Sequence, residues 1–299
     1  MKTKIIIIGM GNMGKRHLQA ICHLAVPLEF YCYDLNPVAL ESVKNFCQQN
    51  FISNENITLT TDHNQIIANI SSQAVVIIAS TARGRAALLE QIIKQRPKAI
   101  LAEKPLCQTT AEYEQLTILA KQEAVPIYLN FTRHMYPFYR QIKQSFNGSE
   151  GVLFKAAFPN GLACIGIHIF ELMTWLTKTK SATVVKSQLE AAFNSKRAGY
   201  QDFYGSLKVE IDGGQVCTFV SRQKDQTAII EISSNRNQYL IDESKIEAPY
   251  TSQISDKVVS DLIEKGETDK LPDIFQSYLA HKILFDYMQQ VGRENANVT

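Results

Sequence analysis

The sequence predicts an α/β protein in which an N-terminal doubly wound parallel sheet precedes a C-terminal α+β domain with a large open, mostly antiparallel sheet. Three observations predict this architecture. Strand-like and helix-like segments alternate over the first 130 residues, and a glycine-rich loop from Gly9 to Gly14 joins the first strand to the first helix. After about residue 132 the strands become longer and alternate between apolar and polar residues. The length of 299 residues is that of about two domains.

The N-terminal elements follow from short apolar runs separated by helical stretches. Continuous apolar runs predict strands of a parallel sheet that is buried on both faces. Strand–helix alternation then predicts right-handed crossover connections. The expected strands cover 4–8, 28–33, 57–60, 74–79, 99–102 and 126–131, and the expected helices cover 13–24, 36–49, 84–94 and 111–123.

The second half of the chain predicts a sheet with one covered face, because apolar residues there recur at every second position. The residues Asp212, Gly213 and Gly214 predict a hairpin turn. We expect a first domain over 1–130 and a second over 131–299, with the C-terminal helix at 272–290 as a candidate to pack back on the first domain. The expected strands cover 183–193, 207–211, 215–220, 227–232 and 238–241, and the expected helices cover 162–176, 254–265 and 274–290.

Composition and charge exclude several classes of protein. The chain has 31 Lys and Arg against 29 Asp and Glu, a net charge of +2, with no basic tract that would indicate nucleic-acid binding. Its apolar runs are far shorter than a membrane span, so we expect no membrane partner. The six cysteines are scattered, without a C-x-x-C pair or a Cys/His cluster at metal spacing. We therefore expect a reduced, cytoplasmic protein without a metal site.

The glycine loop predicts a dinucleotide site. Gly9 permits the tight turn, Gly11 lets a pyrophosphate approach the backbone, and Gly14 allows the helix to pack closely on the strand. Asn12 and Met13 complete this loop at the helix N-terminus, where free N–H groups favour phosphates. The alternative is an ordinary glycine-rich turn.

An acidic residue follows the second expected strand at the spacing of a ribose-binding carboxylate. Asp34 lies 20 positions beyond Gly14. No arginine follows it to accommodate a 2′-phosphate, so the sequence favours NAD over NADP. The alternative is a surface aspartate that caps a helix.

Two further segments lie at the carboxyl edge of the expected sheet, where ligands of open α/β sheets bind. Ser80 and Thr81 follow the fourth strand and could line the cofactor, although capping of the next helix is an equal alternative. Glu103, Lys104 and Pro105 follow the fifth strand. A lysine beside a dinucleotide site can hold a substrate hydroxyl and stabilise its charge during hydride transfer.

These motifs resemble the Gfo/Idh/MocA oxidoreductase family over nearly the whole chain. The resemblance rests on the glycine loop, Asp34, the Glu103-Lys104-Pro105 sequence, residues 130–137 and residues 161–171. It implies an N-terminal Rossmann domain, NAD(P)-dependent oxidation or reduction of sugars, inositols, amino sugars or nucleotide sugars, and a homo-oligomer, dimer or tetramer, formed through the C-terminal sheet.

The resemblance also assigns roles to individual residues. Lys104 would contact nicotinamide and substrate, with Glu103 beside it at the cofactor, and His168 would exchange the proton in step with hydride transfer. Asn130 and Arg133 match positions near the substrate. The pKa of an ordinary histidine suits acid–base work at neutral pH, while the alternative for His168 is packing on an apolar helix.

The sequence departs from the family pattern where many members have an aspartate four residues before the histidine, since Cys164 stands there. We expect Cys164 to line the substrate site as a small packing residue. Three residues after the histidine, the common Asp is replaced by Glu171. In the region where family members often have a histidine after the fourth strand, this chain has Arg83 and Arg85. These arginines are either ligands of an anionic substrate group or helix-surface residues. A non-catalytic regulatory protein that binds NAD and sugar, and a reductase of a non-sugar substrate, are the alternative functions.

Overall fold

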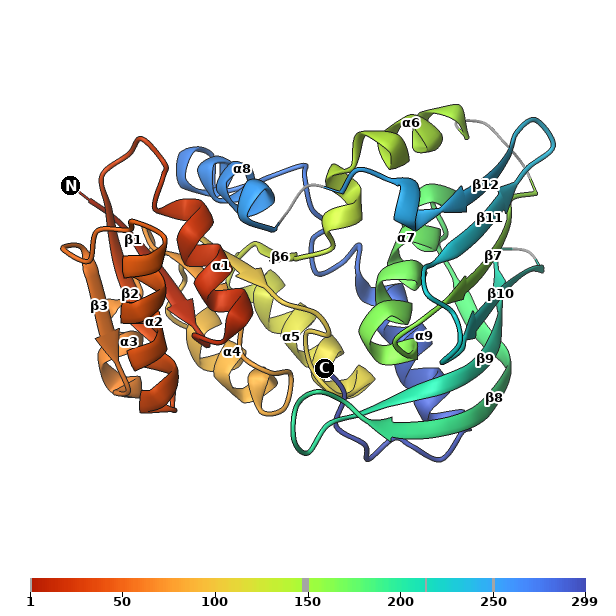
Figure 1. Cartoon of the computed structure of the whole chain (residues 1–299), viewed down its shortest axis with the longest axis horizontal. Coiled ribbons are helices and arrows are strands. Elements are labelled where there is room, and N and C mark those ends of the chain that lie inside the picture. Colours follow the sequence, from red (N-terminus) through yellow and green to blue (C-terminus); the bar gives the residue numbers. More distant parts are fainter. Residues whose placement is uncertain (1, 147–150, 213, 249–250) are drawn as a thin grey trace. The chain divides into compact units, whose positions relative to one another are not determined.

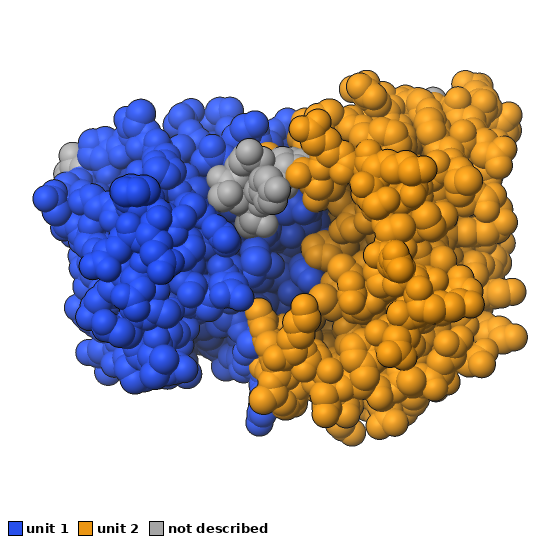
Figure 2. Space-filling model, viewed as in Figure 1, with its two compact units in different colours: residues 1–107, 112–132, 249–274 blue, residues 108–111, 133–248, 275–299 orange. Residues whose placement is uncertain are grey.

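The computed structural model describes residues 2–146, 151–212, 214–248 and 251–299 (Figure 1). The chain forms two compact units, coloured separately in Figure 2. The segment 249–274, which the sequence analysis assigns to the second domain, belongs to unit 1. Unit 1 comprises Met1–Cys107, Glu112–Thr132 and Pro249–Ile274, and unit 2 comprises Gln108–Ala111, Arg133–Ala248 and Phe275–Thr299.

Unit 1 is built on a six-stranded parallel sheet in the order β3-β2-β1-β4-β5-β6. This order reverses direction between β1 and β4, whose carboxyl ends mark the usual ligand-binding edge. Every residue of β4, β5 and β6 is buried, as the continuous apolar runs predicted. The strands are β1 (Thr3–Ile8), β2 (Leu28–Tyr33), β3 (Ile57–Thr60), β4 (Val75–Ile78), β5 (Ala99–Ala102) and β6 (Ile127–Leu129).

Helices connect these strands, and the four expected ones are present with ends shifted by a few residues. A short additional helix, α3, begins after Asp62, whose carboxylate accepts a hydrogen bond from the Asn64 N–H at 2.8 Å. Its seven residues are too few for a clear helical period. The helices are α1 (Asn12–Ile21), α2 (Pro37–Gln49), α3 (His63–Asn69), α4 (Arg85–Ile93) and α5 (Thr110–Gln122).

A late segment of the chain returns to this sheet. Helix α8 (Thr251–Glu264) packs against α1, beside which it lies in Figure 1. Beyond the helix, the Leu129 N–H donates to the Pro272 carbonyl at 2.9 Å, and Tyr128 forms an antiparallel bridge with Asp273. The returning segment therefore continues the sheet past β6.

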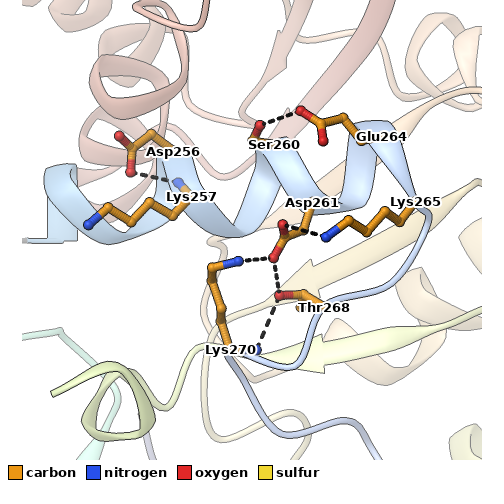
Figure 3. Close-up of polar contacts among 8 residues, drawn as sticks. All are labelled: Asp256, Lys257, Ser260, Asp261, Glu264, Lys265, Thr268 and Lys270. Atoms are coloured by element: carbon orange, nitrogen blue, oxygen red, sulfur yellow. Dashed lines mark hydrogen bonds and ion pairs between the residues drawn. The ribbon is translucent and has the colours of Figure 1, made fainter. Parts of the chain in front are cut away.

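A polar cluster fixes the turn between α8 and that bridge (Figure 3). The Asp261 carboxylate accepts a hydrogen bond from the Thr268 hydroxyl at 2.9 Å and pairs with Lys270 and Lys265. Burial raises the pKa of Asp261, but these partners outweigh burial and hold the pKa below its usual range. The carboxylate thus fastens residues that follow the helix to its last turn.

Unit 2 contains a second six-stranded sheet in the order β12-β11-β7-β10-β9-β8. Only β7 and β10 are parallel neighbours, so the sheet is mostly antiparallel, which confirms the predicted fold class. The predicted turn at 212–214 includes Gly213, which lies outside the described residues. The strands are β7 (Leu153–Phe158), β8 (Ala182–Asn194), β9 (Gln201–Ile211), β10 (Gln215–Ser221), β11 (Ile229–Ser233) and β12 (Gln238–Asp242).

The helices of unit 2 differ from expectation in two respects. The expected helix at 162–176 consists of a π-helical turn, η2 (Leu162–Gly166), followed by α7 (Ile167–Thr177). The final helix, α9 (Tyr278–Gln290), packs on α7 and β8 within unit 2, and it is α8 that packs on α1. The other helical segments are η1 (Thr132–Met135), α6 (Pro137–Ser145) and η3 (Glu243–Lys245). Among the described residues, none of the helices is long and apolar enough to cross a membrane.

Candidate functional site

The three glycines of the loop after β1 meet three different surroundings. Gly9 has a φ of +93°, and a Cβ there would lie 2.4 Å from the Ser80 backbone nitrogen, so this loop and the loop after β4 are in close contact. A Cβ on Gly14 would lie 2.0 Å from the Gly9 carbonyl oxygen. A Cβ on Gly11 would meet no atom within 4 Å. These surroundings match the turn, close-packing and open-approach roles that the sequence predicts.

The open side of Gly11 lies at the N-terminus of α1. Gly11 is the N-cap of this ten-residue helix, and no side chain caps it. Gly11 and Asn12 are exposed, Met13 is half-buried, and the first turn carries no acidic residue. Uncapped N–H groups and the positive end of the helix dipole attract phosphate groups. The residues present therefore fit the pyrophosphate of NAD.

Asp34 lies next to this loop, just beyond β2. Its Oδ2 accepts a hydrogen bond from the Met10 N–H at 2.7 Å, and its Oδ1 accepts one from the Asn36 N–H at 2.9 Å. The carboxylate is half-buried and fixed in orientation by both bonds. Each carboxylate oxygen has a second lone pair, so Asp34 can still accept hydrogen bonds from the hydroxyls of a ribose.

Ser80 and Thr81 are half-buried in the loop after β4. The N-cap of the following helix, α4, is Gly84, which has a φ of +72° and no side-chain cap. Capping of α4 therefore does not account for the two hydroxyl residues. Their position beside Gly9 places them at the same edge of the sheet as the glycine loop.

The Glu103 side chain is held by two residues from other elements. Its Oε1 accepts a hydrogen bond from Asn130 Nδ2 at 2.6 Å and lies 3.3 Å from His17 Nε2. Burial raises the pKa of Glu103, but His17, Asn130 and the nearby charge of Lys104 together hold it below its usual range. An ionised carboxylate can only accept hydrogen bonds. In the contact between His17 and Glu103, His17 Nε2 is therefore the donor.

His17 connects this carboxylate to the returning segment. The ring is fully buried on α1, and its Nδ1 lies 2.8 Å from the Ser255 hydroxyl of α8. Neither His17 nor Ser255 is among the residues predicted from the sequence. A signal for His17 exists, because it lies on the buried face of α1 that includes Leu18 and Ile21, where a polar residue needs partners.

Lys104 is half-buried and lies in unit 1. It directly follows Glu103, whose side chain is held by Asn130 and His17. The bond between Lys104 and Pro105 is cis. His168 is half-buried in unit 2, as the second residue of α7. Both side chains are thus partly accessible within their own units.

The turn before His168 is organised by a buried aspartate from β9. Asp202 accepts hydrogen bonds from the Ala163 N–H at 2.8 Å and the Cys164 N–H at 2.9 Å. A Cβ on Gly161 would lie 2.1 Å from the Asp202 carboxyl carbon, so glycine is required for this approach. Cys164 itself is half-buried. The aspartate fixes the π-helical turn, a feature that often accompanies functional sites.

Glu171, three residues after His168, contacts another histidine, His134. Its Oε1 lies 2.6 Å from Nε2 of His134, and both side chains are buried. The His134 ring stacks on Trp175, with ring centroids 4.0 Å apart, and Lys143 lies 4.2 Å from the centre of the same Trp175 ring. Burial lowers the pKa of Lys143 to about 8. This cluster is not predicted from the sequence.

Arg133 forms a bidentate ion pair within unit 2. Its Nε and Nη2 donate to the two oxygens of Glu243 at 2.7 and 2.5 Å, and the Tyr139 hydroxyl donates to the same carboxylate at 2.6 Å. The pair lowers the pKa of Glu243 against the opposing effect of burial. A substrate contact by Arg133 would use the N–H groups that this pair leaves over, two on Nη1 and one on Nη2.

The structure therefore brings together two groups of the expected residues in unit 1. The glycine loop meets Asp34 and Ser80, and Glu103 meets Asn130. Among the described residues, no group of three or more His, Cys, Asp or Glu side chains is arranged to hold a metal ion.

Comparison with known proteins agrees with this geometry. Residues 3–131 match the sequence model of an oxidoreductase family with an NAD-binding Rossmann fold. Among curated proteins, no sequence matches this chain.

Several solved structures are similar over almost the whole chain. The WlbA dehydrogenase of Bordetella pertussis, in complex with NADH and UDP-GlcNAcA, is 11% identical with a TM-score of 0.79, covering 97% of this chain and 96% of its own. GenD2 from gentamicin A biosynthesis, in complex with NAD, is 14% identical with a TM-score of 0.78 and coverages of 97% and 94%. The myo-inositol dehydrogenase of Lactobacillus casei, in complex with NAD(H) and myo-inositol, is 14% identical with a TM-score of 0.74 and coverages of 98% and 96%. At these identities the likeness shows a shared fold.

Proposed function

Since residues 3–131 belong to the Gfo/Idh/MocA oxidoreductase family, which has an NAD-binding Rossmann fold, we propose that this enzyme acts on a sugar, amino sugar or nucleotide sugar. NAD supplies the hydride acceptor or donor, and the reacting centre of the substrate is a hydroxyl or keto carbon. The observation that carries the proposal is the loop at Gly11, open at an uncapped helix N-terminus and next to a fixed Asp34 carboxylate.

In the proposed reaction, Lys104 and His168 act on the same substrate oxygen. When an alcohol is oxidised, the His168 imidazole would accept the hydroxyl proton, and NAD held by the glycine loop and Asp34 would supply the hydride-accepting chemistry. The Lys104 ammonium donates a hydrogen bond to the oxygen and stabilises its developing negative charge. Reduction reverses each transfer. Asn130, Arg133 and Cys164 are proposed to lie around the substrate, and Ser80, Thr81 and Glu103 around the cofactor.

The substrate class rests on two supports. Two proteins that share the fold were solved with UDP-GlcNAcA and with myo-inositol, both polyhydroxylated rings. In addition, the family resemblance of Lys104 and His168 implies chemistry at a carbon that bears oxygen. The proposed division keeps cofactor binding in unit 1 and most substrate contacts in unit 2.

Turnover with a panel of sugars, inositols and nucleotide sugars tests the proposal. Oxidation or reduction is followed through the absorbance change between NAD and NADH. Lys104→Ala and His168→Asn should each abolish turnover while NAD binding, measured by calorimetry, persists. Lys94→Ala, at an exposed lysine at the end of α4, is the matched control and should behave as the unaltered enzyme. Unchanged turnover in Lys104→Ala would exclude the assigned role.

Cys164 favours a second candidate function, because a thiol replaces a carboxylate next to the proposed proton-transfer residue. Under that alternative the protein binds NAD and a sugar but transfers no hydride, as a regulatory protein would. Sugar binding detected by calorimetry with no turnover for any compound in the panel would support it. Turnover with an imine or another non-sugar compound alone would instead indicate a reductase of a different substrate class.

We further propose a cytoplasmic homo-oligomer that associates through the exposed face of the second sheet. All six cysteines are free, which suits a reducing compartment. On β8, Val185 is 49% exposed, which makes it an apolar residue on the outer face. Light scattering of the purified protein should give the mass of a dimer or tetramer. Val185→Glu should weaken this association and lower the measured mass.

A further inference from the structure

A buried arginine ties together the two loops at the carboxyl edge of the first sheet. Arg85, the first residue of α4, is only 2% exposed. Its Nη2 donates to the Ser80 carbonyl in the loop after β4, and its Nη1 donates to the carbonyls of Glu103 and Pro105 in the loop after β5. A single guanidinium thus joins two segments that adjacent strands deliver to the same edge.

The choice of arginine follows from the geometry of the three acceptors. A guanidinium presents five N–H donors in a rigid plane and remains charged, so it can satisfy carbonyls that lie in different directions. A lysine ammonium is a single point of charge on a flexible chain and cannot span the same set. Charge-assisted bonds of this kind are about twice as strong as neutral ones.

Two of the three carbonyls belong to the neighbours of Lys104. Because Glu103 and Pro105 are both held by Arg85, the backbone is fixed on each side of the lysine. The Glu103 side chain is held separately by Asn130 and His17. Arg85 therefore fixes the backbone of the segment that carries Lys104. Asn130 and His17 fix the side chain of Glu103, the first residue of that segment.

We propose that Arg85 is a positioning residue for Lys104: it sets the place of the lysine relative to the Ser80 loop and thereby to the cofactor. This inference rests on the proposed function, in which Lys104 stabilises charge on the substrate oxygen. The structure excludes one of the two roles that the sequence left open for this arginine. Arg85 is not a helix-surface residue, because its side chain is only 2% exposed and its guanidinium donates to backbone carbonyls.

The test compares Arg85→Lys, which keeps the charge and loses the planar fork, with the same change, Arg96→Lys, at an exposed arginine that follows α4. A misplacement of about 1 Å can cost about a hundredfold in rate. We expect Arg85→Lys to lower kcat about 10- to 100-fold, with the Kd for NAD from calorimetry changed by less than about threefold. Arg96→Lys should leave both quantities unchanged.

A second variant distinguishes positioning from stability. In Arg85→Ala the side chain is removed, and added guanidinium ion at a concentration that does not unfold the protein should restore part of kcat. Added ammonium ion should not, since it lacks the fork. A purely structural role would appear as a lower Tm with normal kcat per folded enzyme and no rescue.

The outcomes separate this inference from the function on which it rests. If Arg85→Lys turns over at the normal rate while Lys104→Ala is inactive, the positioning role is wrong and the proposed function stands. If Lys104→Ala keeps its activity, the proposed function itself fails. A tenfold or greater weakening of NAD binding in Arg85→Lys, with kcat unchanged, would also overturn the positioning role, since the arginine would then serve the cofactor loop alone.

Discussion

Substituting Gly11 by alanine separates cofactor binding from stability of the fold. Gly11 has φ −68° and ψ −163°, an extended conformation that alanine adopts without strain. The new methyl group would meet no atom of the protein within 4 Å. It would instead occupy the open space at the N-terminus of α1, where we expect the pyrophosphate of NAD to approach the backbone.

The two expected effects differ in size. A glycine-to-alanine change restricts the unfolded chain and stabilises a protein by about 0.4–1 kcal/mol. Gly11 is the N-cap of α1, however, where alanine is less favourable than glycine, so these two contributions to folding stability offset each other. In the complex, the methyl group holds the phosphates away from the backbone N–H groups. Loss of one such charge-assisted hydrogen bond costs about 1.5–3 kcal/mol. That cost corresponds to a roughly 10- to 150-fold increase in the Kd for NAD.

The matched comparison is Gly14→Ala, in the same loop. Its Cβ would lie 2.0 Å from the Gly9 carbonyl oxygen, so the loop and helix must move apart. Forcing an extra methyl group into a packed site costs about 1–3 kcal/mol. Calorimetric titration with NAD and thermal unfolding without NAD should show weak binding with little change in Tm for Gly11→Ala, and a lower Tm for Gly14→Ala. If Gly11→Ala bound NAD as tightly as the unaltered protein, the phosphates would not approach the backbone at Gly11.

The other predictions concern single carboxylates. Asp34→Ser should weaken NAD binding and reduce the preference for NAD over NADP, and equal affinities of the unaltered protein for both cofactors would contradict the ribose contact. Glu243→Gln should cost about 1.5–3 kcal/mol of unfolding free energy, because the half-buried Arg133 loses its charge-assisted hydrogen bonds. The exposed control Glu247→Gln should cost less than about 0.5 kcal/mol in denaturant titration. Because folding lowers the pKa of Glu103, its ionised form stabilises the protein above about pH 4.5, and this contribution disappears as the pH falls through the lower pKa of the folded state. Glu103→Gln should therefore destabilise the protein at pH 7, by an amount that shrinks on acidification, and a pH-independent difference would exclude this linkage.

Local sequence was sufficient for the architecture of the nucleotide-binding region. The strands predicted at 28–33, 57–60 and 99–102 have those same bounds in the structure. Short apolar runs flanked by turn residues specify such strands without reference to distant residues. The glycine spacing likewise specified three surroundings that the structure reproduces, and the prediction of an NAD-binding oxidoreductase fold is confirmed.

Local pattern was insufficient where a helix is irregular. The apolar period over 162–176 predicts one continuous helix, but the structure has a π-helical turn before α7. That turn depends on the Asp202 carboxylate, which comes from β9 and binds the backbone of Ala163 and Cys164. The spacing of apolar residues over 162–176 indicates neither the wider π-helical turn nor its contact with Asp202.

By itself, the sequence determined which residue types follow which strands, and therefore the class of cofactor, because a glycine loop and an acidic residue at a fixed spacing act within one crossover unit. Only the tertiary structure decided the partners of the buried polar and charged groups. His17 meets Ser255 across 238 positions, and Arg133 meets Glu243 across 110. A buried charge needs a partner, but any of several distant residues could satisfy it, and the packing of the elements selects one.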